Sequence, residues 1–251
     1  MESLTIHHGG TEGTEKNNDV VFLRGLRASV VNQFGSWMKD DTVPTRTTSL
    51  DDWARAIARP TISPAGGSAA ALAAAAAAAL VEMVAALTAA REAYALVHEE
   101  ARAARARAEG LRQELLTLAS ADAESLQRLV QALALPAGSE AERELRSRRK
   151  RSALREGAEI QRDVLAGCAE VAVLGLALVE RGLKSARGDA GAAVFLAAGA
   201  ARSASWAIRM NLEDEPPDSE FSGIAKVAAA KLAAVEEAER LAGRLLDGQP
   251  G

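Results

Sequence analysis

Apolar residues recur at the three- and four-residue spacing of an α-helix along most of the chain after residue 48. Segments rich in proline, glycine and serine interrupt this pattern at Pro60, Pro136 and Pro216. Ser49 and Ser68 stand where N-caps are expected, directly before two of the apolar segments. The pattern predicts helices at residues 49–59, 69–88, 94–133, 139–180, 189–211 and 218–246.

The longest predicted helices indicate how the chain packs. Residues 69–88 are apolar on all sides except at Glu82, which predicts a central, buried helix. Residues 94–133 carry a narrow apolar seam like that of a coiled coil. Long helices with short connections predict an all-α antiparallel bundle. A helix of 40 residues spans roughly 60 Å, more than a compact monomer of this size needs. We therefore also predict a homodimer, or a larger assembly, in which the long helices cover each other.

Composition supports this fold class and excludes others. Alanine is abundant and aromatic residues make up 3% of the chain, which disfavours sheets and favours closely packed helices with an alanine-rich core. The single cysteine, Cys168, excludes a disulfide framework or a cysteine-rich metal site. The net charge of −4 offers no overall field for nucleic acid.

The first part of the chain differs from the rest. Residues 1–45 are polar, poor in alanine and without a clear period, which predicts a disordered or non-native tail before a helical domain at 46–251. The N-terminus lacks the order of a signal peptide, and the uncharged apolar stretches are too short to span a bilayer. We therefore expect a cytoplasmic protein with no membrane contact.

Charged residues on apolar stripes are the first candidates for function, because a buried charge is costly unless it is paired. Asp122 continues the seam of residues 94–133 and is predicted to lie in the core. Glu82 is the single charge in its helix, and either lines a cavity or pairs with an arginine such as Arg209. Asp189 opens a helix rich in alanine and glycine, where it is either a site residue or an N-cap.

Two other features have both a functional and a structural interpretation. Residues 63–68 place two glycines and a serine before an apolar helix, which favours an anion-binding turn but is also ordinary cap chemistry. The basic run at residues 146–151 could bind nucleic acid, but the acidic residues around it favour a solvated helix face. No motif for a metal or a dinucleotide is present, so we expect no metal and no cofactor.

Several of these residues occur together in one known pattern. Glycines and a serine precede an alanine-rich helix that contains Glu82-Met83-Val84, and Asp122 follows downstream. The remaining elements, in chain order, are Arg91, Tyr94, Leu135-Pro136, Gly188-Asp189 and Arg209-Met210-Asn211-Leu212. Over about residues 50–246 this order resembles the cyclodeaminase/cyclohydrolase family. That family includes the C-terminal domain of formiminotransferase-cyclodeaminase and bacterial methenyltetrahydrofolate cyclohydrolases.

The resemblance implies an enzyme whose partner is a folate substrate. A cyclohydrolase interconverts 5,10-methenyltetrahydrofolate with its formyl form, and a cyclodeaminase makes it from 5-formiminotetrahydrofolate with release of ammonia. Asp122 and Asp189 would then be the acid and base, and Glu82 a supporting carboxylate, all in one crevice between two subunits. The residues implied in substrate binding are Gly66, Gly67, Ser68, Arg91, Tyr94, Arg209 and Asn211.

The alternative is a helical dimer that has lost turnover and only binds folate or serves as a scaffold. Five departures from the family pattern favour this alternative. They occur at Ala65, at Ser125-Leu126, at Ala137, at Gly188 and at Ala207.

Overall fold

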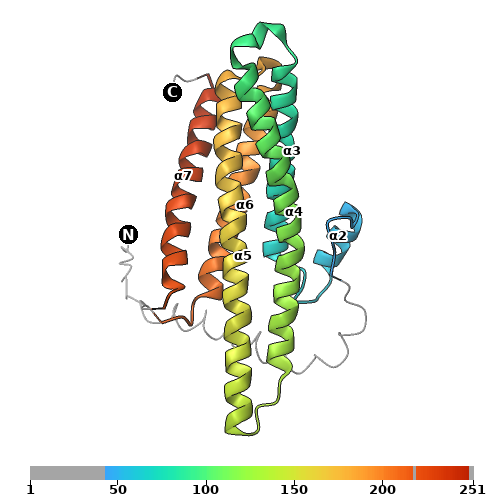
Figure 1. The fold of residues 1–251 in the computed structure, drawn as a ribbon, viewed down its shortest axis with the longest axis vertical. Helices are drawn as coiled ribbons and strands as arrows, with labels where there is room; N and C mark the ends of the chain where they lie inside the picture. The colour runs from blue at the N-terminus through green and yellow to red at the C-terminus, as the bar shows by residue number, and fades with distance from the viewer. Residues whose placement is uncertain (1–42, 217–218, 249–251) are drawn as a thin grey trace, which may run out of the picture. The chain divides into compact units, whose positions relative to one another are not determined.

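The computed structural model describes residues 43–216 and 219–248, and these residues form an antiparallel helical bundle (Figure 1). They contain no strand, so the predicted all-α fold and antiparallel arrangement are confirmed. The helices are α2 (Leu50–Ala58), α3 (Gly66–Ala89), η1 (Glu92–Val97), α4 (His98–Ala134), α5 (Glu140–Arg181), η2 (Lys184–Ala186), α6 (Arg187–Asn211) and α7 (Ser222–Leu246). The predicted tail at residues 1–45 lies outside the described residues up to position 42 and stays a prediction.

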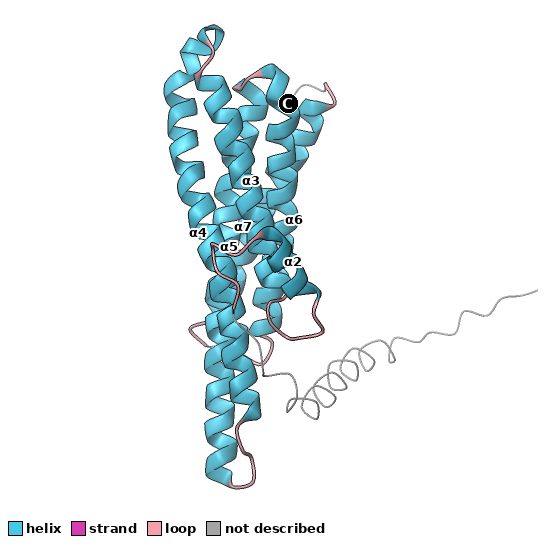
Figure 2. Cartoon of the chain, turned by 90° about the vertical axis from the view of Figure 1, so that its right-hand side faces the viewer, coloured by secondary structure: helices cyan, strands magenta, loops and turns pink. Residues whose placement is uncertain are grey.

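Four helices make the centre of the bundle. Helices α3, α4, α5 and α6 run alternately up and down and pack on one another, while α7 covers α5 and α6 (Figures 1 and 2). Helices α4 and α5 have 37 and 42 residues, against 24 or 25 in α3, α6 and α7. The connected ends of α4 and α5 therefore extend past the other helices as a hairpin.

Local signals explain most helix ends. The Ser49 hydroxyl accepts a hydrogen bond from the Asp52 backbone N–H and caps α2. Ser139 and Glu142 form a reciprocal capping box at the start of α5. The helix predicted over residues 94–133 instead begins at His98, because the backbone of Val97 before it is not helical and residues 92–97 form the separate short helix η1.

The predicted Ser68 cap was wrong, and so was the N-cap alternative for Asp189. Helix α3 begins at Gly66 rather than at residue 69, so Ser68 lies inside its first turn and does not cap it. Helix α6 begins at Arg187, which places Asp189 in the first turn instead of at the N-cap. Both side chains are therefore available for contacts other than capping their own helices.

The core is rich in alanine, as predicted. Most buried positions on α3 and α6 are alanines. The largest fully buried side chains are three leucines, one isoleucine, several valines and one polar residue, Gln161. Small residues bring the helix axes close together: a Cβ on Gly175 of α5 would lie 2.8 Å from Cγ2 of Val194 on α6. Such close contact gains many weak dispersion interactions in place of a few large side chains.

Helix α3 and residues 184–211 are long and apolar enough to cross a membrane by length and composition. The sequence interpretation had considered only uncharged runs and found none of that length. In the bundle 50% and 56% of the 18-residue apolar windows in these two segments is buried, as in the core helices of globular proteins.

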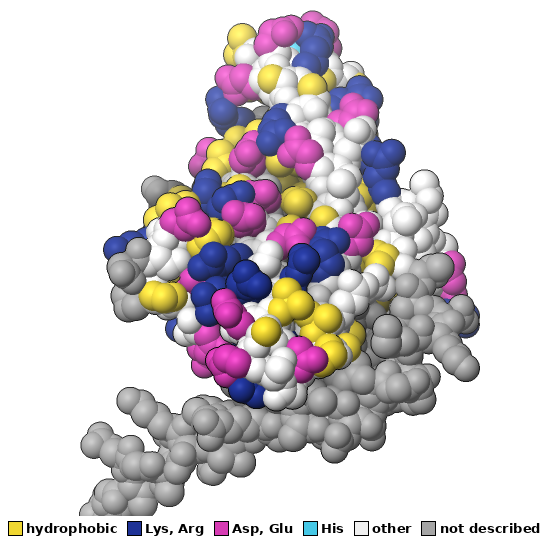
Figure 3. Space-filling model, turned by 60° about the horizontal axis from the view of Figure 1, so that its bottom comes forward, with side chains coloured by type: hydrophobic (Ala, Val, Ile, Leu, Met, Phe, Trp, Pro, Cys, Tyr) yellow, Lys and Arg dark blue, Asp and Glu magenta, His cyan; other side chains and the backbone are white. Residues whose placement is uncertain are grey.

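The exposed end of the α4–α5 hairpin mixes charges of both signs (Figure 3). Lys150 of the basic run pairs with Asp214 at 3.2 Å, and Arg155 pairs with Glu215 at 2.7 Å. Acidic partners from the connection after α6 thus lie beside the basic run. This arrangement agrees with a solvated helix face.

Candidate functional site

The Asp122 carboxyl group is buried in the middle of α4, with 5% of the residue exposed. The Ser68 hydroxyl of α3 donates a hydrogen bond to its Oδ2 at 2.8 Å, and Gln161 Nε2 of α5 donates to its Oδ1 at 2.7 Å. The Ser68 backbone N–H is a further donor, from the first turn of α3. Three helices therefore converge on one carboxyl group, and its burial confirms the prediction from the seam.

Gly67 makes this approach possible. A Cβ at this position would lie 2.4 Å from both Asp122 Oδ1 and Gln161 Nε2, so any side chain there would displace these two groups. At Gly66 a Cβ would meet no atom within 4 Å. The turn predicted to bind an anion thus faces the chain's own carboxyl group, at the positive end of the α3 dipole.

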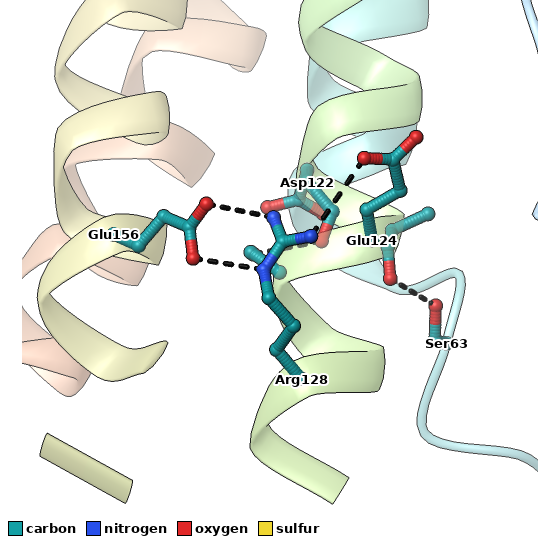
Figure 4. A network of polar contacts seen from close by, with 7 residues as sticks. Ser63, Asp122, Glu124, Arg128 and Glu156 are labelled. Carbon is teal, nitrogen blue, oxygen red and sulfur yellow. Dashed lines mark hydrogen bonds and ion pairs between the residues drawn. The ribbon is translucent and has the colours of Figure 1, made fainter. Parts of the chain in front are cut away.

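Burial raises the pKa of the Asp122 carboxyl group above its ordinary value of 3.8, because desolvation disfavours the charged form. The hydrogen bonds from Ser68 and Gln161 oppose this shift without cancelling it. The nearby guanidinium of Arg128 is directed to Glu156, at 2.7 and 2.9 Å, and lies 3.8 Å from Glu124 (Figure 4). The groups that donate hydrogen bonds to the Asp122 carboxyl group are therefore all neutral.

The polar groups continue to the end of α6. The Ser125 hydroxyl donates to the Asp122 carbonyl oxygen at 2.9 Å. A Cβ on Gly157 of α5 would lie 2.8 Å from Asn211 Nδ2 and 3.6 Å from Ser125 Oγ, so these side chains are close neighbours. We call Ser68, Asp122, Ser125, Gln161 and Asn211 the polar junction.

Other predicted site residues lie at the opposite end of α3. The Tyr94 hydroxyl accepts a hydrogen bond from the Lys184 backbone N–H at 3.0 Å, and Thr88 Oγ1 accepts one from Leu183 N at 3.0 Å. Arg91 and Asp189 are exposed near these contacts. Twenty helical residues separate Ser68 from Thr88, or about 30 Å at 1.5 Å per residue. A single chain does not bring Asp122 and Asp189 together.

Glu82 lies between the two ends. It pairs with Arg112 of α4 at 2.9 Å. Both side chains, together with Arg105, line a hollow of 370 Å³. Glu82 therefore both lines a hollow and pairs with an arginine, and that arginine is Arg112 rather than Arg209. Arg209 instead stacks on Trp206, with its Cζ 5.0 Å from the ring centre. The three acidic residues expected in one crevice are apart within one chain.

Gln161 and Ser125 were missed by the sequence interpretation. Gln161 lies on the helix stripe of α5 that also contains Ala158, Val164 and Leu165. A polar residue on an apolar stripe is the signal that identified Asp122. The charged residues that surround Gln161 in the sequence hide this signal. Among residues 43–216 and 219–248, no three His, Cys, Asp or Glu side chains are grouped as a metal site would need.

The close approach at Gly67 predicts a difference between two neighbouring glycines. We expect Gly67→Ala to lower the free energy of unfolding by about 1–3 kcal/mol, because its Cβ overpacks the junction. Gly66→Ala, where the Cβ has open space, should change the stability by less than about 0.5 kcal/mol. Urea unfolding followed by circular dichroism measures both, and equal effects would contradict the contact.

The raised pKa of Asp122 predicts a pH-dependent stability. Because the folded state holds this proton more tightly than the unfolded chain, the contribution of Asp122 to stability falls as pH rises from 3.8 to its folded pKa. Asp122→Asn has no carboxyl group at this position, so its stability does not fall for this reason as pH rises. The free energy of unfolding of the variant, relative to the parent, should therefore increase across that window in urea titrations at a series of pH values. A difference between variant and parent that stays constant with pH would show that burial does not shift the pKa of the Asp122 carboxyl group.

Comparison with known proteins places the chain in a family. Residues 49–230 match the model of the formiminotransferase-cyclodeaminase family. A methenyltetrahydrofolate cyclohydrolase of Methylorubrum extorquens is 29% identical over 163 residues, which cover 65% of this chain and 78% of that protein. The crystal structure of formiminotetrahydrofolate cyclodeaminase from Thermotoga maritima superposes with a TM-score of 0.72 at 25% identity. The match covers 80% of this chain and 97% of that one. The chain therefore belongs to the formiminotransferase-cyclodeaminase family.

Proposed function

We propose that this protein is an enzyme of tetrahydrofolate one-carbon chemistry and that it opens 5,10-methenyltetrahydrofolate by addition of water. The observation that carries this proposal is the buried Asp122 carboxyl group in a member of this family. Hydration needs one base to activate water, and one chain supplies one buried carboxyl group at the junction. The cyclodeaminase reaction needs, in addition to a base, an acid for the leaving ammonia, and hydration does not need this second group.

The ionised form of Asp122 would act as the base. It accepts a proton from water while the water oxygen bonds to the positively charged methenyl carbon. The carbon–N5 bond of the resulting adduct then breaks, N5 takes the proton from Asp122, and the adduct hydroxyl releases its proton to solvent as the formyl carbonyl forms. A raised pKa suits both steps, because a base is effective when its pKa is near the working pH.

The low polarity around Asp122 favours a cationic substrate. An amidinium-like methenyl group carries positive charge, and its attraction to a carboxylate is stronger in a poorly screened site than in water. Asn211 and the backbone of Gly66 lie at the same end of the bundle, where they could contact ring heteroatoms. This arrangement supports binding of the one-carbon end of the folate near the polar junction.

Asp189, Arg91 and Tyr94 would reach such a site from a second copy of the chain. The outward face of α3 carries no charge from residue 69 to residue 81, and α6 beside it exposes large apolar side chains. Exposed members of this apolar face are Met83, Leu87, Phe195, Leu196, Trp206 and Met210. The outer surface of α4 and α5 instead carries ion pairs such as Arg107–Glu170.

We therefore propose a homodimer through the α3 and α6 faces, not through the long helices. An antiparallel two-fold pairing along α3 would place the glycine end of one copy beside the Asp189 end of the other. Each site would then draw Asp122 from one protomer and Asp189 from its partner.

The activity is tested by the ultraviolet absorbance of methenyltetrahydrofolate mixed with the purified protein. We expect faster loss of absorbance with the parent protein and a fall in kcat/KM of at least about 100-fold in Asp122→Asn, because the base is removed. Asp163→Asn, an exposed aspartate on α5, should stay within about twofold.

Three other results would contradict this assignment. Ammonia release from 5-formiminotetrahydrofolate without hydration would make the protein a cyclodeaminase. Stabilisation by folate without turnover would leave a binding protein. If the protein shows neither turnover nor stabilisation by folate, it serves only as a helical scaffold.

The shared site is tested by light scattering and by mixing variants. Leu87→Glu places a charge in the apolar face and should halve the molar mass, whereas Val173→Glu on the outer side of α5 should not. Co-refolded Asp122→Asn and Asp189→Asn chains should recover about a quarter of the parent activity, since half of the dimers contain one intact site. A monomeric parent, or no recovery on mixing, would contradict the proposal.

A further inference from the structure

The Gln161 side chain is fully buried on α5, with 0% of the residue exposed. Its Nε2 donates to Asp122 Oδ1 at 2.7 Å, while its Oε1 has no hydrogen-bond partner. Buried carbonyl oxygens without a hydrogen-bond donor are uncommon in native proteins, and such an oxygen usually has a structural or functional reason. A leucine or methionine would fill similar space without leaving a polar atom unpaired.

We propose that Gln161 is a positioning residue that holds the Asp122 carboxyl group in both of its protonation states. The amide N–H₂ donates to Asp122 Oδ1 in the arrangement that the structure shows, and this arrangement suits the ionised carboxylate. After a half-turn of the amide, Oε1 occupies nearly the same place and accepts a hydrogen bond from the protonated carboxyl group. This inference rests on the proposed function, in which Asp122 takes up a proton and then releases it.

The chemistry of the amide supports this role. Its terminal torsion has two nearly equivalent settings, and its oxygen and nitrogen are similar in size. The second partner of Asp122, the Ser68 hydroxyl, can likewise donate or accept. Both partners therefore keep a hydrogen bond to Asp122 when its proton comes or goes.

The charged groups around Asp122 do not compete with this arrangement. On α4 the neighbours are Glu124 and Arg128, and on α5 the neighbour is Glu156, which pairs with Arg128. The first turn of α3 carries no acidic residue, and α6 contributes the neutral Asn211. A cation in place of Gln161 would hold Asp122 in the ionised form, and a carboxylate there would compete for its proton.

The test is a titration of Asp122 in the ligand-free full-length chain, observed by NMR of ¹³C-labelled aspartate carboxyl carbons. Gln161→Met keeps the shape of the side chain and removes both hydrogen-bonding groups. We expect the pKa of Asp122 to rise by about one unit, because the hydrogen bond lost from the ionised form is charge-assisted and stronger than the one lost from the protonated form. Gln113→Met, an exposed change on α4, should leave the titration as in the parent.

The pH profile of kcat gives a second readout. In Gln161→Met the acidic limb should move upward with the pKa of Asp122, and kcat should fall about tenfold with KM within about twofold, as for a residue behind the reacting group. An unchanged titration in a folded Gln161→Met protein would overturn the inference.

Gln161→Glu keeps a hydrogen-bonding side chain and provides a test if the methionine variant does not fold. It should divide the single titration of Asp122 into two separated steps, since two adjacent carboxyl groups share one proton. A single step at the parent pKa would refute the coupling. If the titrations change as expected while the parent protein opens no methenyltetrahydrofolate, the proposed function fails and the role of Gln161 as the partner of Asp122 stands.

Discussion

A carboxyl group buried among helices has to find its hydrogen bonds within the protein, and Asp122 finds them at the N-terminus of α3. That contact requires the backbone of α3 to approach α4 and α5 more closely than a Cβ at position 67 allows. Gly67 therefore determines how α3 enters the bundle, and the Ser68 hydroxyl and N–H complete the contact. Burial without a cation leaves the carboxyl group with a raised pKa, the property on which the proposed chemistry depends.

The same geometry explains why some departures from the family pattern are tolerated by the backbone. Ala65 precedes α3 in an extended conformation with φ −137°, which does not require glycine. A Cβ at Gly188 would meet no atom within 4 Å, so a serine would fit there as well. The position with a strict steric requirement, Gly67, keeps its glycine. The departures at these two places therefore require no change in the backbone.

The bundle separates two kinds of surface. Ion pairs cross the outer side of α4 and α5, for example between Arg107 and Glu170 or between Arg128 and Glu156. The outward side of α3 is made of alanine, leucine and methionine, and α6 adds aromatic side chains to it. Apolar surface of this extent is more costly in water than a charged one. This difference favours the α3 and α6 faces, rather than the long helices, for contact with a second copy.

Local sequence determined the helices of this protein, because spacing, caps and prolines act over a few residues. The capping box at Ser139 and the burial of Asp122 within an apolar seam follow from such short-range patterns. Only the tertiary structure decided the partners of the acidic residues. Asp122 meets Ser68 and Gln161 across 54 and 39 residues of chain, Glu82 meets Arg112, and Asp189 lies at the far end of α3. Such pairings depend on how whole helices pack, and helix periodicity carries no information about which faces meet.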